Sequence, residues 1–292
     1  MKTLTASIAS PATISKGSKG RRKGDSRIGV LTYVSAATFF MICFGALFAP
    51  WIAPYDPYSV DFFATLQPPS WQHLFGTDLQ GRDLFSRVLF GARLTLFTSF
   101  VAIVVGGFIG AFLGLVSVFI PWTDMVIGRL LDVLLAFPAI LFGLALAASM
   151  GQGTMSVVIA LCIATIPEVG RIARSTGMGV MQQEYMESGK TVGLGNVALF
   201  IKYLAWNSAP TIFTFLTLGF GSIILLGAGL NFLGLGAQSP LAELGTLAAE
   251  GRNVLPIAPH IATFPSLTIF VLVLSLNVLG DAMRDHMDTR LI

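Results

Sequence analysis

One short run of the sequence has residue types that could bind a phosphate group, Gly189-Lys190-Thr191. A phosphate-binding loop also needs a first glycine five residues before the second one, so that backbone N–H groups can close around the phosphates. Glu184 occupies that position, and no strand pattern precedes it. The chain is therefore not expected to bind ATP itself.

The other residue types that could do chemistry are scattered. His73, His260 and His286 stand singly, and Cys43 and Cys162 both fall inside apolar runs, where a thiol behaves as a small hydrophobic group. No H-E-x-x-H motif, cysteine pair or G-x-S-x-G motif is present. We predict a non-catalytic chain that binds no metal and no cofactor.

Charged residues inside apolar runs need an explanation, because a charge in a bilayer is costly. Arg129 and Asp132 are three residues apart, which places them on one helical face and favours a structural pair over a transport role. Glu168 has the same spacing from Arg171. Both pairs are expected near the ends of their helices.

Composition identifies the elements that carry these residues. Of 292 residues, 54% are hydrophobic and 11% charged, a balance far from that of soluble proteins. Apolar runs long enough to cross a bilayer recur along the chain. The predicted fold class is all-α, a polytopic membrane protein with about six transmembrane helices, the first of them retained and not a cleaved signal peptide. The predicted helices span 28–53, 93–119, 127–149, 155–172, 211–236 and 261–281.

Charge predicts the orientation. The tail 1–27 is basic and indicates a cytoplasmic N-terminus, since a nucleic-acid-binding patch is improbable beside a membrane anchor. Its basic residues are Lys16, Lys19, Arg21, Arg22, Lys23 and Arg27. An even number of spans then places the tail 284–292 in the cytoplasm, the segment 54–92 in the periplasm as compact turns, and the core at 93–283. Four basic residues weaken this charge argument because they fall on the outer side: Arg82, Arg87, Arg93 and Arg252.

Small residues and prolines suggest how the spans pack. The second run carries glycines at a spacing that allows close approach of another helix: Gly106, Gly107, Gly110 and Gly114. Pro138 and Pro167 remove backbone donors and are expected to kink or end their helices.

The inner loop at about 171–210 has a pattern of its own. Residues 184–192 favour a short helix, Gly193 stands where a helix commonly stops, and 199–204 favour a second amphipathic helix. A helix outside the membrane with an apolar face needs a partner groove.

At these residues the sequence resembles the EAA loop of binding-protein-dependent ABC importer permeases. Glu187-Ser188-Gly189 stands where the family has Glu-Ala-Ala, and Gly193 matches the family's glycine. Further segments resemble the dipeptide, oligopeptide and nickel permease group, over about 28–290: Gly76-Thr77-Asp78-Leu79-Gln80-Gly81-Arg82-Asp83, Arg129-Leu130-Leu131-Asp132-Val133, Ala136-Phe137-Pro138, Asn231-Phe232-Leu233-Gly234-Leu235-Gly236 and Ala249-Glu250-Gly251-Arg252.

The resemblance is to the C-type subunit and implies its partners: a second, related permease, two ABC ATPase subunits that bind ATP and Mg, and a periplasmic binding protein, in a bacterial inner membrane. It implies a set of ATPase-coupling residues, Glu184, Glu187, Ser188, Gly189, Gly193, Leu194, Gly195 and Asn207. Structural or pathway candidates are Arg129, Asp132, Pro138, Asn231, Gly234, Gly236 and Asn277. Trp206 and Thr289 replace prolines that the family commonly has.

The expected function is import of peptides or a related small solute, such as a metal chelate, an opine or a glycoside. Two alternatives are a secondary transporter that works without an ATPase and a non-transporting membrane scaffold. The acids here lie near helix ends, whereas a secondary transporter is expected to place them near the midplane.

Overall fold

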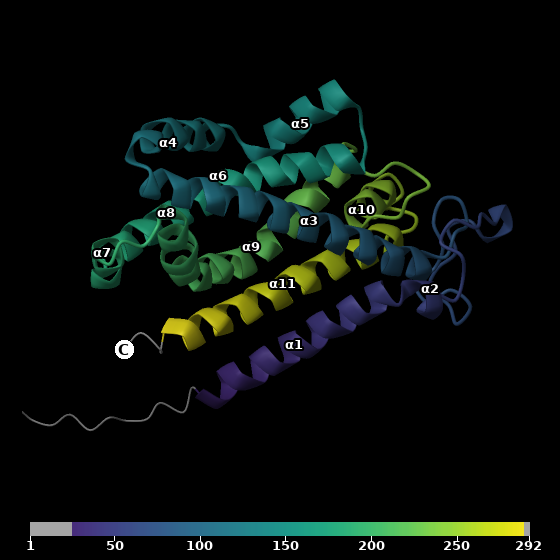
Figure 1. The fold of residues 1–292 in the computed structure, drawn as a ribbon. Coiled ribbons are helices and arrows are strands. Elements are labelled where there is room, and N and C mark those ends of the chain that lie inside the picture. The colour runs from purple at the N-terminus through teal and green to yellow at the C-terminus, as the bar shows by residue number, and fades with distance from the viewer. Residues whose placement is uncertain (1–24, 289–292) are drawn as a thin grey trace, which may run out of the picture.

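The computed structural model describes residues 25–288, which contain helices and no β-strand (Figure 1). The basic residues Lys16 to Lys23 and the departure at Thr289 lie outside this range. The long helices are α1 (Asp25–Leu47), α3 (Leu84–Phe119), α4 (Pro121–Ala136), α5 (Ala139–Met150), α6 (Thr154–Met181), α9 (Trp206–Phe232) and α11 (His260–Asp288). The short ones are α2 (Ala49–Ile52), the 3-10 helix η1 (Phe62–Ala64), α7 (Glu184–Thr191), α8 (Asn196–Ala198), the π-helix η2 (Leu199–Ala205) and α10 (Leu244–Arg252).

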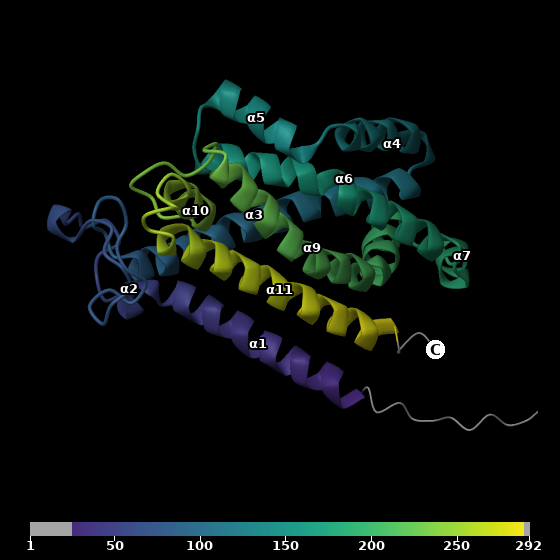
Figure 2. The ribbon, with the colours of Figure 1, turned by 180° about the vertical axis from the view of Figure 1, so that it is seen from behind.

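Within the described residues, five helical segments are long and apolar enough to cross a membrane. The pair α4 and α5, bent by 87° at its break, gives a sixth if it is taken as one span. Each of the six predicted apolar runs is therefore mostly helical, and the third is interrupted at Phe137 and Pro138. Figures 1 and 2 show α7, the start of α1 and the end of α11 at one end of the bundle, called here the α7 end. The segment 48–83 and α10 lie at the opposite end, the α10 end.

Several predicted bounds were wrong. The second span begins at Leu84 and not at residue 93, because Asp83 caps the helix by accepting a hydrogen bond from the Ser86 N–H. α6 runs on to Met181, and the fifth span begins at Asn196, where α8, η2 and α9 form one continuous segment to Phe232. The loop predicted at about 171–210 is therefore confined to 182–195.

The predicted close packing through glycine is confirmed between α3 and α6. A Cβ atom on Gly110 would lie 2.4 Å from the backbone oxygen of Ile166, and one on Gly114 would lie 2.3 Å from that of Gly170. No side chain fits at such distances, so the two backbones are in direct contact.

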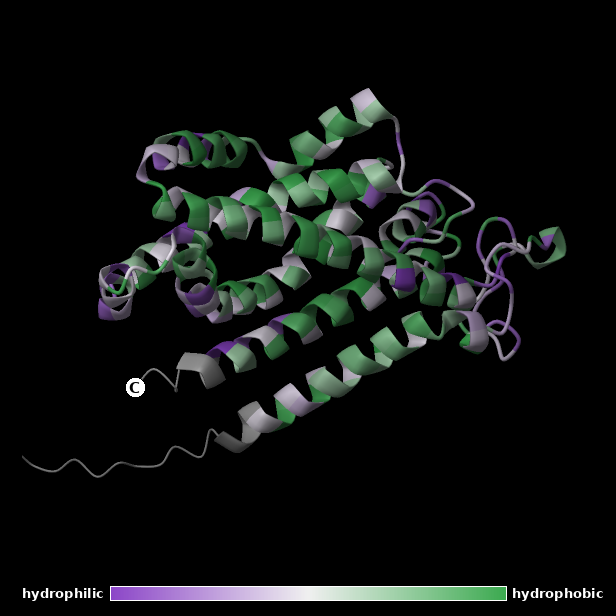
Figure 3. Cartoon of the chain, in the orientation of Figure 1, coloured by the Kyte–Doolittle hydropathy of each residue, from purple (hydrophilic) through white to green (hydrophobic). Residues whose placement is uncertain are grey.

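Hydropathy and aromatic residues mark the membrane. The bundle is predominantly hydrophobic along its length, and hydrophilic residues concentrate at its two ends (Figure 3). The four tryptophans and five tyrosines also lie toward the two ends, as expected for side chains at membrane–water interfaces. At the α10 end are Trp51, Tyr55, Tyr58 and Trp71; toward the α7 end are Tyr33, Trp122, Tyr185, Tyr203 and Trp206.

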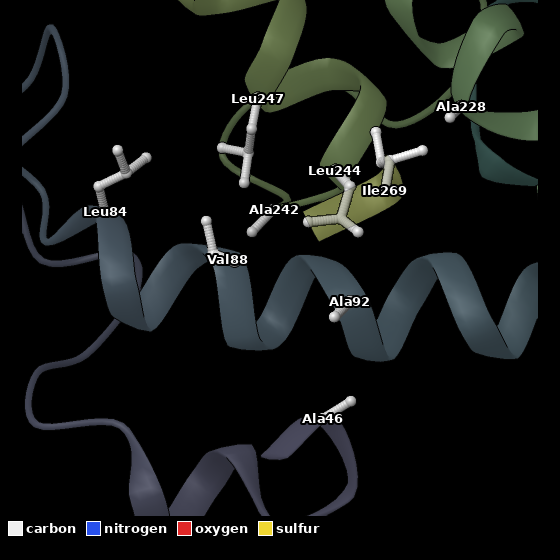
Figure 4. Packing of buried hydrophobic residues seen from close by; sticks show 9 residues of the cluster. All are labelled: Ala46, Leu84, Val88, Ala92, Ala228, Ala242, Leu244, Leu247 and Ile269. Carbon is white, nitrogen blue, oxygen red and sulfur yellow. The ribbon is translucent and has the colours of Figure 1, made fainter. Parts of the chain in front are cut away.

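An apolar cluster joins the elements at the α10 end. Figure 4 shows Leu84, Val88 and Ala92 of α3 facing Leu244 and Leu247 of α10. This packing holds the short helix α10 against the bundle.

Candidate functional site

The turn after α7 is a complete helix-ending motif. Gly193 has a φ of +82°, and its N–H donates to the Lys190 carbonyl at 3.0 Å. The Leu194 N–H donates to the Gly189 carbonyl at 3.1 Å, which completes the Schellman arrangement. The short helix and glycine turn predicted from the sequence are confirmed, and the backbone at Gly193 is left-handed.

One side of α7 is anchored and the other is open. Met186 is fully buried in a core cluster with Leu204 of η2, whereas Glu184 and Glu187 are exposed. Ser188 is exposed as well. The helix is thus fixed to the bundle and presents a charged face outward, on which Lys190 is exposed as well.

Apolar side chains extend this open surface beyond the turn. Val192 is 80% exposed, and Leu194 and Gly195, which follow it in the same loop, are also exposed. Exposed apolar groups outside a bilayer indicate a contact surface for another protein.

Gly189 is buried where α7 meets η2. A Cβ atom there would lie 2.8 Å from Cδ2 of Leu199, so a larger residue would require that side chain to move. Farther along, Asn207 donates from Nδ2 to the Tyr203 carbonyl at 2.6 Å, next to the exposed Trp206. The predicted second amphipathic helix is thus the first part of the fifth span.

Two ion pairs join α4 to α6. Arg171 donates to Asp132 at 2.8 Å, and Arg174 donates to both carboxylate oxygens of Asp124 at 2.7 and 2.8 Å. The spacing of Arg129 and Asp132 had suggested that these two residues pair with each other. Asp132 instead pairs with Arg171 on another helix. The pair predicted between Glu168 and Arg171 is likewise replaced by the bond from Arg171 to Asp132.

Pro138 marks the break between α4 and α5, where the span turns by 87°. The kink or helix end predicted at this proline is confirmed. Pro167, by contrast, lies inside the continuous helix α6.

The candidates near the end of α9 form a second glycine turn. Gly234 has a φ of +79°, and Asn231 is buried, donating to the Gly227 carbonyl and accepting from the Ala237 N–H, each at 2.9 Å. A Cβ atom on Gly236 would lie 1.9 Å from Oδ1 of Asn231. Asn231 therefore connects the C-terminal turn of α9 to the loop that follows it.

Asn277 has different surroundings. It is exposed and lines a groove of about 470 Å³ between α9, α10 and α11.

A buried ionic cluster at the α10 end was not predicted. Arg82 donates to Asp78 at 2.7 Å, and Arg87, fully buried, donates both to Asp78 and to Glu250, the latter at 2.8 Å. These acids neutralise two of the arginines that weakened the charge argument. No local pattern could have found the contact between Arg87 and Glu250, because 163 residues separate them.

Glu243 is a second buried acid at this end. It accepts a hydrogen bond from the Thr95 hydroxyl at 2.6 Å and from the Thr246 N–H at 3.0 Å, which caps α10. Burial raises the pKa of Glu243 to about 7. Among residues 25–288 no three metal-ligating side chains come together.

Comparison with known families gives two matches. Residues 106–292 match the family described as binding-protein-dependent transport system inner membrane component. Residues 31–69 match the N-terminal transmembrane domain of oligopeptide transport permease C.

The chain is also similar to individual permeases in sequence and to solved transporters in fold. The chain is 40% identical, over 88% of its length and 86% of theirs, to the glutathione transport system permease proteins GsiD of Escherichia coli O6:K15:H31 and Shigella boydii serotype 4. In fold it resembles the methionine transporter MetNI in inward-facing conformations (TM-score 0.57, 16% identity, 69% of this chain and 97% of that one). It also resembles an amino acid ABC transporter with histidines (TM-score 0.54, 18% identity, 69% and 94%).

The chain belongs to the family of inner membrane components of binding-protein-dependent transport systems. Within it, the chain is a permease C-type subunit of the oligopeptide and dipeptide group of ABC importers. It is a non-catalytic, multi-pass membrane subunit, and the ATPase resides on partner chains. This assignment decides against the secondary transporter and the scaffold.

Proposed function

We propose that α7 and the turn at Gly193 are the segment through which ATP hydrolysis on partner subunits drives transport. The proposal is supported above all by the form of this segment, a short helix anchored at Met186 with an exposed charged face and the exposed Val192 beside it. The ATPase contacts would come from the residues named for coupling, Glu184, Glu187, Ser188, Gly189, Gly193, Leu194, Gly195 and Asn207.

In this proposal the α7 end is cytoplasmic. The basic tail 1–27, the tail 284–292 and α7 then lie on the side of the ATPase, and 54–83 with α10 lie in the periplasm. In this orientation Arg82 and Arg87 are periplasmic, and their charges are balanced by Asp78 and Glu250 within the folded protein.

The cargo we propose is a peptide, and the glutathione permeases among the relatives point to a short one. A periplasmic binding protein would deliver it to the α10 end. A second, homologous permease would complete the path, and two ABC ATPase subunits would bind ATP and Mg. This chain would supply one half of a path through the bilayer.

A mechanical route supports this coupling. α6 leads into the α7 loop, and the two ion pairs join α6 to α4, which ends at the bend before Pro138. A push on α7 would therefore reach the bent span, and the bundle would rock between two packings.

Two experiments test the proposal. Mild-detergent purification of the tagged chain should recover a second permease and P-loop ATPases in stoichiometric amounts. Proteoliposomes holding that complex should take up short peptides only with ATP inside and the binding protein outside. Recovery of the chain alone, from a preparation in which complexes survive, would refute the proposal.

A further inference from the structure

An apolar groove of about 660 Å³ lies between α1, α3 and the residues before α10. Cys43, Ala46 and Leu47 of α1 form one wall, and Phe90 and Phe97 of α3 are part of the other. Its volume falls within the range of roughly 300–1,000 Å³ that is typical of small-molecule sites.

The groove contains one charged side chain, Arg93, which is exposed. Every other cation at the α10 end is engaged: Arg82 and Arg87 by acids, and Arg252 by the ring of Phe232, 5.4 Å from its centroid. In the part of the chain that the structure describes, Arg93 forms no ion pair.

The position of Arg93 is that of a membrane interface. Its groove neighbours include Leu47, the last residue of α1, and Tyr58 from the segment after α1. Trp51, 78% exposed, lies between them in sequence, and such aromatic residues sit at the level of the lipid headgroups. An arginine at this depth can reach a phosphate while its methylene groups stay among apolar side chains.

We propose that this groove binds a phospholipid, with an acyl chain along the apolar walls and the phosphodiester on Arg93. An anionic lipid such as phosphatidylglycerol fits best, because a zwitterionic headgroup brings its own ammonium to compete for the phosphate. The apolar lining with a single unpaired cation matches such an amphiphile in both parts. Assignment to the outer leaflet rests on the proposed orientation; the site itself does not.

The test is lipid retention by the purified importer complex, measured by native mass spectrometry during titration with phosphatidylglycerol or phosphatidylethanolamine. Arg93→Gln should weaken phosphatidylglycerol binding about fivefold, the effect of one basic residue near a lipid surface. Arg93→Lys should retain most of the binding. Arg252→Gln is the matched control, because it removes an exposed arginine at the same end but outside the groove.

A second variant tests the apolar part of the site. Cys43→Phe fills the groove without changing charge and should also reduce retention. Equal retention by wild type, Arg93→Gln and Cys43→Phe would overturn the proposal. So would retention by the isolated chain that disappears on assembly, since a partner protein would then occupy the groove. Neither result depends on transport, so failure here is distinct from failure of the proposed function.

Discussion

Arg174 of α6 donates to both carboxylate oxygens of Asp124 of α4, at 2.7 and 2.8 Å. The neighbouring pair, Arg171 with Asp132, has a single bond of 2.8 Å, and its side chains are 61% and 59% exposed against 37% and 38% for the first pair. Two hydrogen bonds in place of one, together with lower exposure to water, make the interaction between Arg174 and Asp124 the stronger of the two. It is therefore the stronger link between α6 and α4.

We expect Asp124→Asn to lower the thermal stability of the complex more than Asp132→Asn. An exposed pair contributes at most about 1 kcal/mol, whereas a two-point, half-buried pair can exceed that. Thermal unfolding of both variants, with Arg174→Gln as the second arm of a double-mutant cycle, measures the difference. Equal losses in the two asparagine variants would contradict the ranking.

Gly193→Val should abolish ATP-driven uptake while the complex still assembles. A β-branched residue in the left-handed region costs about 1–2 kcal/mol or more, so the turn would adopt another shape and α7 would no longer be presented correctly. Gly193→Asn is the matched control, because asparagine tolerates this backbone. Uptake and ATPase rate are measured together in proteoliposomes. Unchanged uptake in the valine variant would disprove the role given to this turn.

Asn231→Ala should destabilise the protein by about 1–3 kcal/mol, because it leaves the buried Ala237 N–H without an acceptor. Asn277→Ala, at an exposed position, should have little effect on stability. Thermal unfolding and the KM for peptide uptake distinguish stability from transport. A shift in KM without loss of stability in the Asn231 variant would instead place this side chain in the path.

Glu243 predicts a pH dependence of stability. Its pKa is raised from 4.5 to about 7, so between these values the folded state keeps a proton that the unfolded state has released. The free energy of unfolding should fall as pH rises through this window, by up to about 3 kcal/mol, and level off above pH 7.

Glu243→Gln removes the titrating carboxyl. The variant should therefore lose this part of the pH dependence of the free energy of unfolding. The measurement is the unfolding midpoint of both proteins from pH 4.5 to pH 8. If the difference in unfolding midpoint between wild type and variant does not change with pH, the Glu243 carboxyl is ionised over the whole range. The raised pKa of Glu243 would then be wrong.

The sequence predicted the parts of the fold that depend on local chemistry. The apolar runs became helices, and Gly193 adopted the left-handed backbone, because lipid solvation and turn geometry act over a few residues. Helix bounds were less accurate. Leu84 begins α3 because of a cap and a buried ionic cluster that hydropathy does not detect.

Contacts between distant residues could not be predicted. The spacing of Arg129 and Asp132 describes one helix and says nothing of Arg171 on the next. The break at Pro138 was expected, but its 87° angle depends on how α5 packs against other helices. The link from Arg87 to Glu250 requires the folded α10 end.

The glycine contacts between α3 and α6 have a further consequence for how the sequence can vary. At Gly106, Gly110 and Gly114 even a methyl group would collide with a neighbouring backbone. A saturation mutagenesis library selected for growth on the imported nutrient should therefore show a line of positions, four residues apart, at which alanine is depleted as strongly as leucine. That line would trace the helix seam in the living cell without any structural measurement.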